Sequence, residues 1–397
     1  MIYLPKFIKE MIEKIESAGF EAYAVGGCIR DLLLGRKPSD WDITTSALPE
    51  NILNIFYDFP TIPVGISHGT VSVVTENGPV EITTYRIDGE YLDSRHPLKV
   101  MFSKKISDDL SRRDFTINSM AYNPRLGLVD LFGGKADLDK KVVRCVGEPS
   151  LRFGEDALRI MRALRFAAVL GFKIDDKTSL EIFSCKDRLR YIARERIAVE
   201  ISKLILVDNP CNILTKYSSV FASVLGFENI DRWSQNSISV FKAEKSLSIR
   251  LALLLDGMDS VKILKGLRLD NKTVSEVKLL SSYLNQEFLP EGVFVKKLLS
   301  KIGADSFCPV LKAKEAKFPK QKKELNQIKQ VFEKIVADCE CYSIKQLAVN
   351  GCDLKNTLGI KGIEIGKTLS TLLDAVIEGK CENTKSELLR FAKNKSE

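Results

Sequence analysis

Histidine is scarce in this sequence, and long apolar runs are missing. Only His68 and His96 occur among 397 residues. Two histidines are too few to build a histidine-based metal site, so the sequence does not contain a separate phosphohydrolase segment of the kind that depends on one. No apolar run reaches the ~18 residues that a membrane span needs, and charges interrupt the N-terminal stretch KFIKEMIEKIE, unlike a secretory signal. We therefore expect a cytoplasmic protein with no membrane partner.

The nine cysteines are odd in number and scattered, which indicates reduced thiols rather than a disulfide framework. Cys339 and Cys341 lie close together, but neither histidine has ligand spacing to them, so a zinc site is not expected. The chain is too long for one ordinary core, and several domains are expected. Its formal net charge of +8 is consistent with a polyanionic partner.

The most informative stretch is residues 25–42, VGGCIRDLLLGRKPSDWD. Asp40 and Asp42 flank Trp41, and on a strand two such side chains project to the same side. Two acids on one face repel each other unless a cation lies between them. Two Mg²⁺ ions about 3.5–4 Å apart can activate an attacking hydroxyl and stabilise a leaving pyrophosphate. The pair therefore indicates a metal platform, with a solvated strand end as the plainer alternative.

A glycine pair precedes these acids. Gly26 and Gly27 follow the apolar run AYAV and precede the helix-like RDLLLG, which predicts a strand-to-helix turn. Without a Cβ there, backbone N–H groups can approach phosphate oxygens, and Arg30 adds charge one turn later. The alternative is a merely tight turn. The combination G-G…D-x-D resembles the signature of the nucleotidyltransferase superfamily.

Polar residues further along are candidates for the same site. Glu81 alternates with apolar positions in the strand-like VEITTYR, so it is either a third acid beside the pair or an exposed strand residue. In RRDFTIN, arginine can fork onto phosphate, aspartate can accept from a ribose hydroxyl, and an asparagine one turn on can support either. The residues concerned are Arg112, Arg113, Asp114 and Asn118. A solvated charged face is the alternative.

Helix signals dominate from about residue 145. In EDALRIMRALRF, Glu155, Arg159 and Arg162 fall at i, i+4 and i+7, and Asp156 lies three before Arg159, so one helix face should carry all four. An acceptor-only carboxylate beside a donor-only guanidinium complements the amine and ring nitrogen of cytosine and adenine. The same pair mismatches uracil and guanine. This predicts base recognition; the alternative is an ordinary salt-bridged surface.

A lysine-rich run lies near the C-terminus, in LKAKEAKFPKQKKELNQIK. We expect Lys320, Lys322 and Lys323 to contact an RNA backbone, although charged strips are usually solvated faces.

Four motifs in this order and spacing, GGCIRDLLLG…DWDI, RRDFTIN, EDALRIMRALRFAAVLGF and RERIAVEISKLIL, resemble those of the class II tRNA nucleotidyltransferases. This family contains the CCA-adding enzymes and the bacterial poly(A) polymerases. The resemblance implies an α+β protein, with a five-stranded mixed sheet flanked by helices in an N-terminal head. An all-α neck, body and tail follow. The expected boundaries are 1–144, 145–206, 207–310 and 311–397.

The resemblance also implies roles. Asp40 and Asp42 would hold Mg²⁺, the R-R-D motif would contact ribose and phosphate, and the E-D-x-x-R motif would read the base of CTP or ATP. The neck, body and tail would hold the tRNA acceptor end, and the tail with its lysines would bind the tRNA. No motif assigns an oligomeric state.

Members of the family differ in product. RIDGEYLDSRHP, within residues 86–97, resembles the flexible loop of members that add all of C, C and A, so full CCA addition is expected. Alternatives are a poly(A) polymerase, although EDALR lacks the proline associated with that group, and a CC-only or A-only enzyme. A noncatalytic RNA-binding protein is a further alternative, but it would have no use for two mutually repelling acids.

Overall fold

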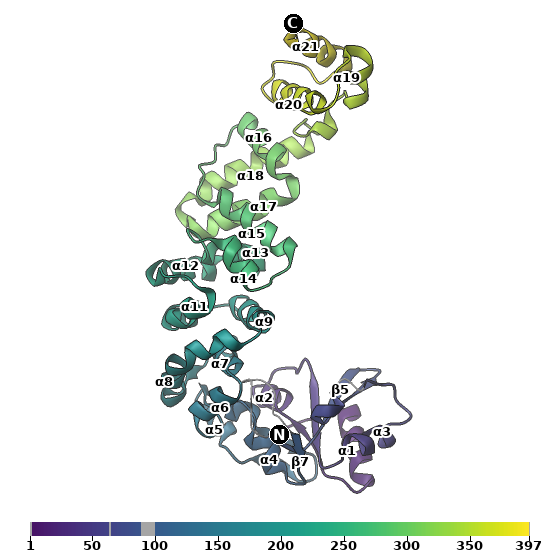
Figure 1. The fold of residues 1–397 in the computed structure, drawn as a ribbon, viewed down its shortest axis with the longest axis vertical. Coiled ribbons are helices and arrows are strands. Elements are labelled where there is room, and N and C mark those ends of the chain that lie inside the picture. The colour runs from purple at the N-terminus through teal and green to yellow at the C-terminus, as the bar shows by residue number, and fades with distance from the viewer. Residues whose placement is uncertain (1, 63–64, 89–99, 397) are drawn as a thin grey trace. The chain divides into compact units, whose positions relative to one another are not determined.

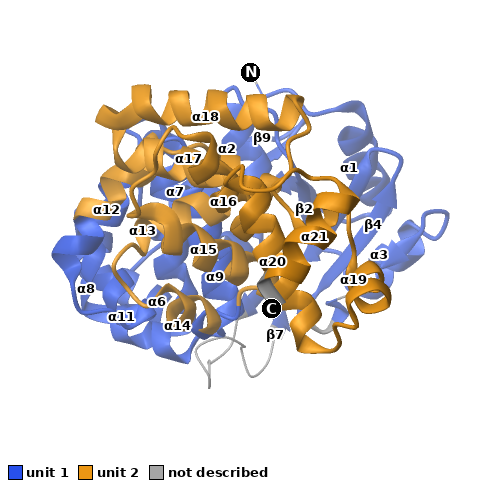
Figure 2. Ribbon diagram, turned by 90° about the horizontal axis from the view of Figure 1, so that it is seen from above, with its two compact units in different colours: residues 1–234, 266–268 blue, residues 235–265, 269–397 orange. Residues whose placement is uncertain are grey.

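The computed structural model describes residues 2–62, 65–88 and 100–396. The chain divides into two compact units (Figure 2). Unit 1 comprises residues 1–234 and 266–268, and unit 2 comprises residues 235–265 and 269–397. The expected division into head, neck, body and tail stays a prediction.

A seven-stranded sheet forms the core of the N-terminal part of unit 1, in the order β3-β4-β5-β2-β1-β8-β9. Only β2 and β5 pair in parallel, so the sheet is mixed, as expected. The strands are β1 (Ala22–Val25), β2 (Trp41–Thr45), β3 (Thr61–Ile62), β4 (Thr70–Thr75), β5 (Gly78–Thr84), β8 (Met120–Asn123) and β9 (Gly127–Asp130).

The α+β fold class is confirmed, but the count of five strands is wrong. The two edge strands are β3, of two residues, and β9, of four. Strands this short carry too few residues for an alternating pattern to stand out from a loop.

Helices cover this sheet. They are α1 (Lys6–Ser17), α2 (Gly27–Leu33), α3 (Pro49–Ile55), α4 (Ile106–Ser111) and α5 (Gly134–Asp139). Four of them, α1 to α4, contact strands of the sheet (Figure 1). In α1 the apolar stripe Ile8, Met11, Ile12 and Ile15 is buried, as helical spacing requires.

The expected specificity loop falls largely outside the described residues. Strands β6 (Arg86–Asp88) and β7 (Val100–Phe102) pair on either side of residues 89–99. The described part of this region is therefore a two-stranded ribbon, which the mixed composition did not predict.

The rest of unit 1 is mainly helical. Its helices are α6 (Pro149–Glu155), α7 (Leu158–Leu170), α8 (Asp176–Cys185), α9 (Arg194–Ile205), α10 (Cys211–Lys216) and α11 (Ser218–Leu225), with α12 (Ile230–Lys242) at its end. The all-α expectation needs a small correction, because β11 (Lys173–Ile174) pairs with β10 (Val142–Val143). Two paired residues leave no sequence period by which to recognise a strand.

One predicted helix is two helices. EDALRIMRALRF breaks at Asp156, where the backbone is extended between α6 and α7. Its side chain accepts the Leu158 N–H at 3.0 Å, a local bond by which aspartate competes with helix continuation. Asp156 is therefore not on one helix face with Arg159 and Arg162.

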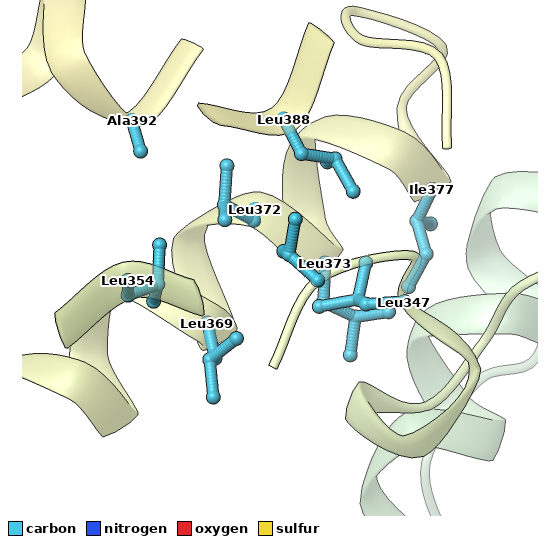
Figure 3. Packing of buried hydrophobic residues seen from close by; sticks show 9 residues of the cluster. Leu347, Leu354, Leu369, Leu372, Leu373, Ile377, Leu388 and Ala392 are labelled. Carbon is cyan, nitrogen blue, oxygen red and sulfur yellow. The ribbon is translucent and has the colours of Figure 1, made fainter. Parts of the chain in front are cut away.

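The described secondary structure of unit 2 is helical: α13 (Leu247–Leu254), α14 (Ser260–Gly266), α15 (Asn271–Leu284), α16 (Gly292–Ile302), α17 (Ala304–Lys317), α18 (Lys322–Ala337), α19 (Gly351–Leu358), α20 (Ile363–Ile377) and α21 (Lys385–Ser396). Figure 3 shows the C-terminal core, where Leu354 of α19, Leu372 of α20 and Leu388 of α21 pack together. Within residues 2–62, 65–88 and 100–396, none of the helices combines the length and apolarity needed to cross a membrane.

The lysine-rich run is not one solvated strip. Lys314 is buried, and its ammonium donates to the carbonyl oxygens of Leu284, at 3.1 Å, and of Gln286. Lys317 pairs with Asp256 at 2.5 Å. Lys320, Lys322 and Lys323 are exposed, in line with an outward-facing role.

Candidate active site

A cavity of about 680 Å³ in unit 1 collects the predicted site residues. They reach it from the β1–α2 turn, from β2 and β5, from the segment after α4, and from the α6–α7 junction and α7. Those that line it are Gly26, Gly27, Arg30, Asp40, Asp42, Glu81, Arg112, Arg113, Asp114, Asn118, Asp156, Arg159 and Arg162. Segments more than a hundred residues apart in sequence therefore meet in one place. Glu155 is not among the lining residues, and Lys320, Lys322 and Lys323 belong to unit 2.

Three carboxylates lie at the strand side of the cavity. Asp42 is the second residue of β2, Asp40 immediately precedes that strand, and Glu81 is Asp42's register partner on β5. The pKa of Asp42 is raised to about 6, chiefly by burial; Arg113 lowers this pKa, and the neighbouring carboxylates of Glu81 and Asp40 raise it. A carboxylate in this setting is stabilised in its charged form by an added cation.

The donor set fits a hard divalent cation. Carboxylate oxygens are the ligands that Mg²⁺ prefers, and a partly open site suits an ion that keeps several waters. Within the described residues no group of three or more histidine, cysteine, aspartate or glutamate side chains is placed to hold a metal ion together, so Asp40 and Asp42 are the pair considered as ligands. Nearby Cys28 offers no soft ligand, because burial raises the pKa of its thiol to about 11.

The glycine turn is required by a close contact. Gly26 ends β1 with φ +81°, and a Cβ built there would lie 2.8 Å from Nη1 of Arg113. Any other residue would be strained in its backbone and would displace this guanidinium. Gly27 begins α2, so the predicted strand-to-helix turn is confirmed.

Both arginines of the R-R-D motif are held by Asp109, a buried residue that sequence reasoning missed. Arg112 donates from Nε and Nη2 to Oδ1, at 3.0 and 2.6 Å, and Arg113 donates from Nη2 to Oδ2 at 3.0 Å. Burial would raise the pKa of Asp109, but the Arg113 and Arg112 guanidiniums outweigh it and hold the pKa below its usual range. The available signal was the spacing of three and four residues from Asp109 to the two arginines.

The third residue of the motif, Asp114, joins the strand side to α7. Its Oδ2 accepts from Nε and Nη2 of Arg162, at 2.8 and 2.6 Å, and its Oδ1 accepts from Asn118 at 3.0 Å. Asn118 in turn accepts from Nη1 of Arg30 at 2.7 Å. Although burial opposes ionisation, Arg162 and Asn118 lower the pKa of Asp114. The predicted contact of Asp114 with a ribose stays a prediction.

Asp156 and Arg159 both line the cavity, but separate partners hold them. Arg159 is buried and donates to Glu155 at 2.5 Å and to the carbonyl oxygen of Arg112 at 2.9 Å. Asp156 accepts from Nη2 of Arg196, a residue of α9, at 3.0 Å. Glu155 thus holds the guanidinium of Arg159 without lining the cavity itself.

Further lining residues were missed: Ser39, Thr83, Arg165, Phe166, Arg196 and Lys203. The Phe166 ring lies beneath the guanidiniums of Arg165, 4.0 Å from the ring centroid, and Arg30, at 5.2 Å. Arg196 and Lys203 are seven residues apart on α9, a spacing that places two cations on one helix face.

Three sequence-family models match separate parts of the chain. The poly A polymerase head domain matches residues 22–144, and the probable RNA and SrmB-binding site of polymerase A matches residues 171–216. The model described as putative tRNA nucleotidyltransferase domain 2 matches residues 241–392.

Relatives match along the whole chain. The CCA-adding enzyme of Staphylococcus epidermidis is 33% identical over 396 residues, which cover 96% of both chains. The structure of the Bacillus stearothermophilus CCA-adding enzyme in complex with CTP is 29% identical, with a TM-score of 0.83 over 99% of this chain and 98% of that one. The Thermotoga maritima CCA-adding enzyme complexed with tRNA shares the fold, at 21% identity and a TM-score of 0.70 over 100% and 97% of the two chains. The chain therefore belongs to the CCA-adding enzymes, a family of class II tRNA nucleotidyltransferases.

Proposed function

We propose that this chain adds C, C and A to the 3′ end of tRNA without a nucleic-acid template, using CTP and ATP and releasing pyrophosphate. One observation carries the proposal: the acid pair and the candidate base-reading residues line the same cavity. Relatives of nearly full length are CCA-adding enzymes, and solved relatives hold CTP or tRNA. We further propose a cytoplasmic location for this reaction.

Asp40 and Asp42 would hold Mg²⁺, with Glu81 as a third acid on the neighbouring strand. When bound, the metal supplies activation of the primer hydroxyl and charge stabilisation of the leaving pyrophosphate. The carboxylates place that chemistry at the strand side of the cavity. Asp109 holds the guanidiniums of Arg112 and Arg113 at the cavity wall, and the fork of a guanidinium matches the oxygens of a phosphate.

The incoming base would be read at the α6–α7 junction. Arg159 uses Nη1 and one Nη2 hydrogen on Glu155 and on two backbone carbonyls, so Nε and the second Nη2 hydrogen remain to donate to a ring nitrogen. Asp156 retains lone pairs for an exocyclic amine. Such a pair accepts cytosine and adenine and leaves buried groups unpaired with uracil or guanine.

We assign Lys320, Lys322 and Lys323 to the tRNA backbone, because all three are exposed on unit 2. Lys322 also pairs with Glu315 at 2.8 Å, an exposed ion pair that costs little to exchange for a phosphate.

The products decide among members of the family. The full-length protein is incubated with tRNA that ends at the discriminator base, with labelled CTP, ATP or both, and the products are sized. We expect CTP alone to add two residues, and both nucleotides together to complete CCA and stop. A long adenosine tail would identify a poly(A) polymerase, arrest after CC or addition of A alone would identify a partial enzyme, and binding without extension would identify a noncatalytic protein.

A further inference from the structure

The carboxylate of Asp156 is held from a different helix. Asp156 lies between α6 and α7 with an extended backbone, φ −141° and ψ 103°, so its side chain does not follow the face of either helix. Its Oδ1 accepts the backbone N–H of Leu158 at 3.0 Å, and its Oδ2 accepts Nη2 of Arg196 at 3.0 Å. The direction of the remaining lone pairs thus depends on this backbone bond and on one side chain from α9.

Helix α9 is itself fixed against α7. Arg165 of α7 donates to Glu200 of α9 at 2.5 Å, and both side chains are largely buried. The apolar face of α9, with Ile197, Ile201 and Leu204, is buried as well. Arg196 therefore projects from a rigid element, which is what a positioning side chain requires.

The guanidinium of Arg196 has a second feature. Its Nη1 is buried and has no hydrogen-bond partner among the described residues, although Arg196 lines the cavity. A buried donor without an acceptor costs free energy, and in a substrate cavity a bound ligand is the natural source of that acceptor.

We propose that Arg196 is a specificity-determining positioning residue, which holds the Asp156 carboxylate in the orientation that accepts the exocyclic amine of cytosine or adenine. This rests on the proposed function and deepens it. A fixed acceptor repels the carbonyl that uracil or guanine presents at that point. A carboxylate that is free to rotate turns away from the carbonyl, so the wrong base is rejected less strongly.

The test compares kcat/KM for CTP and UTP on tRNA that lacks its CCA end, using Arg196→Ala and Arg196→Lys in the full chain. We expect Arg196→Ala to lower the CTP-to-UTP ratio by about 10- to 100-fold, the range for a lost hydrogen bond between charged groups. Arg196→Lys should recover part of the ratio, because one donor and the charge remain.

Arg194→Ala is the matched control. Arg194 lies two residues earlier on α9, donates to the carbonyl oxygen of Val224 at 2.7 Å, and is not part of the cavity wall. Its loss should leave the ratio unchanged, whatever it does to the melting temperature. If Arg196→Ala merely slows addition of both nucleotides alike, Arg196 is a structural brace and the inference is wrong.

A double-mutant cycle shows whether Arg196 acts through Asp156. Arg196→Ala should lower selectivity much less in Asp156→Ala than in the wild-type background. Additive losses would contradict the proposal, and Arg196→Gln replaces Arg196→Ala in the cycle if the latter does not fold. The wild-type ratio of kcat/KM for CTP and UTP distinguishes failure of the proposed function from failure of this inference. If the wild-type protein shows no preference for CTP over UTP, the proposed function is wrong. If it shows a preference that substitutions of Arg196 do not change, only this inference is wrong.

Discussion

Asp42 and Glu81 are register partners on the two parallel strands β2 and β5, so their carboxylates lie side by side on one face of the sheet. Asp40, two residues from Asp42, lines the same cavity. Like charges gathered at one strand end oppose ionisation, and burial adds to this in raising the pKa of Asp42. A divalent cation bound between the carboxylates would offset this repulsion and stabilise their charged form.

Asp42→Asn should therefore abolish nucleotide transfer. Loss of a metal ligand removes several kcal/mol of transition-state stabilisation, on the order of a thousandfold or more in kcat. Binding of tRNA, measured by filter retention, should be nearly unchanged. Asp58→Asn is the control, because Asp58 is an exposed acid of the same unit that pairs with Lys14.

Thermal melting gives a readout of the same site that does not depend on turnover. Mg²⁺ should raise the melting temperature of the wild-type protein, since a ligand bound only to the folded state stabilises it, and a chelator should reverse the shift. Asp42→Asn should lose most of this response. Substantial activity in Asp42→Asn, or an undiminished Mg²⁺ response, would contradict the assignment.

Gly26→Ala should disturb Arg113. The positive φ of Gly26 costs an alanine about 1–2 kcal/mol or more, and the new Cβ would lie 2.8 Å from Nη1 of Arg113. We expect lower thermal stability together with a large fall in kcat/KM for CTP. Gly35→Ala is the matched control, because Gly35 has φ +68° but open space around its Cβ position. Equal activity in the two variants at equal stability would mean that the close contact with Arg113 has no role.

Lys314 should make stability depend on pH. Burial, and to a lesser degree Lys317, lowers its pKa to about 8 in the folded protein, against about 10.4 in an unfolded chain. Between these values the unfolded chain binds more protons, so the free energy of unfolding rises with pH from about 8 to about 10.4. One pKa unit corresponds to about 1.4 kcal/mol.

Lys314→Met should lose this rise in urea melts, whereas Lys312→Met, which alters an exposed pair with Glu244, should keep it. Parallel pH profiles for the wild type and Lys314→Met would show that the ammonium remains charged throughout this window.

Neutralising Lys320, Lys322 and Lys323 to glutamine should weaken tRNA binding and reduce its dependence on salt. Each lost phosphate contact lowers the slope of log K against log salt by about 0.7–0.9. Glu315→Gln should act in the opposite direction, because it frees Lys322 from its 2.8 Å ion pair. Titrations at several salt concentrations measure the tRNA affinity and its dependence on salt. Unchanged slopes would mean that these lysines are ordinary solvated surface residues.

Most residues of the sequence motifs line the cavity, and they could be singled out because each motif is local. Spacing within a strand, a turn or a helix determines which side chains share a face. Asp40 with Asp42, and Gly26 with Gly27, are of this kind. Asp109 is not, since its role depends on burial beneath Arg112 and Arg113 and on a bond from Thr44 of a distant strand. The same holds for Lys314, whose burial comes from packing against α15 rather than from its neighbours in sequence.

The break at Asp156 was missed for a related reason. The segment EDALR contains neither glycine nor proline, and its charges recur at helical spacing. The helix ends there because the Asp156 side chain bonds locally to the Leu158 N–H and also to Arg196 of α9, a contact that becomes available only in the folded chain. Where a side chain serves a site, its tertiary partners override the local pattern.

Selection of the incoming base by the protein itself is the central claim, and Asp156→Ala tests it most directly. The measurement is kcat/KM for CTP, ATP, UTP and GTP on tRNA substrates ending before the C or the A position. We expect the variant to lose much of the preference for CTP and ATP, which can reach ~10⁴-fold where a site hydrogen-bonds its substrate, while its Mg²⁺-dependent melting shift survives. A variant that is slower with every nucleotide but equally selective would contradict the account.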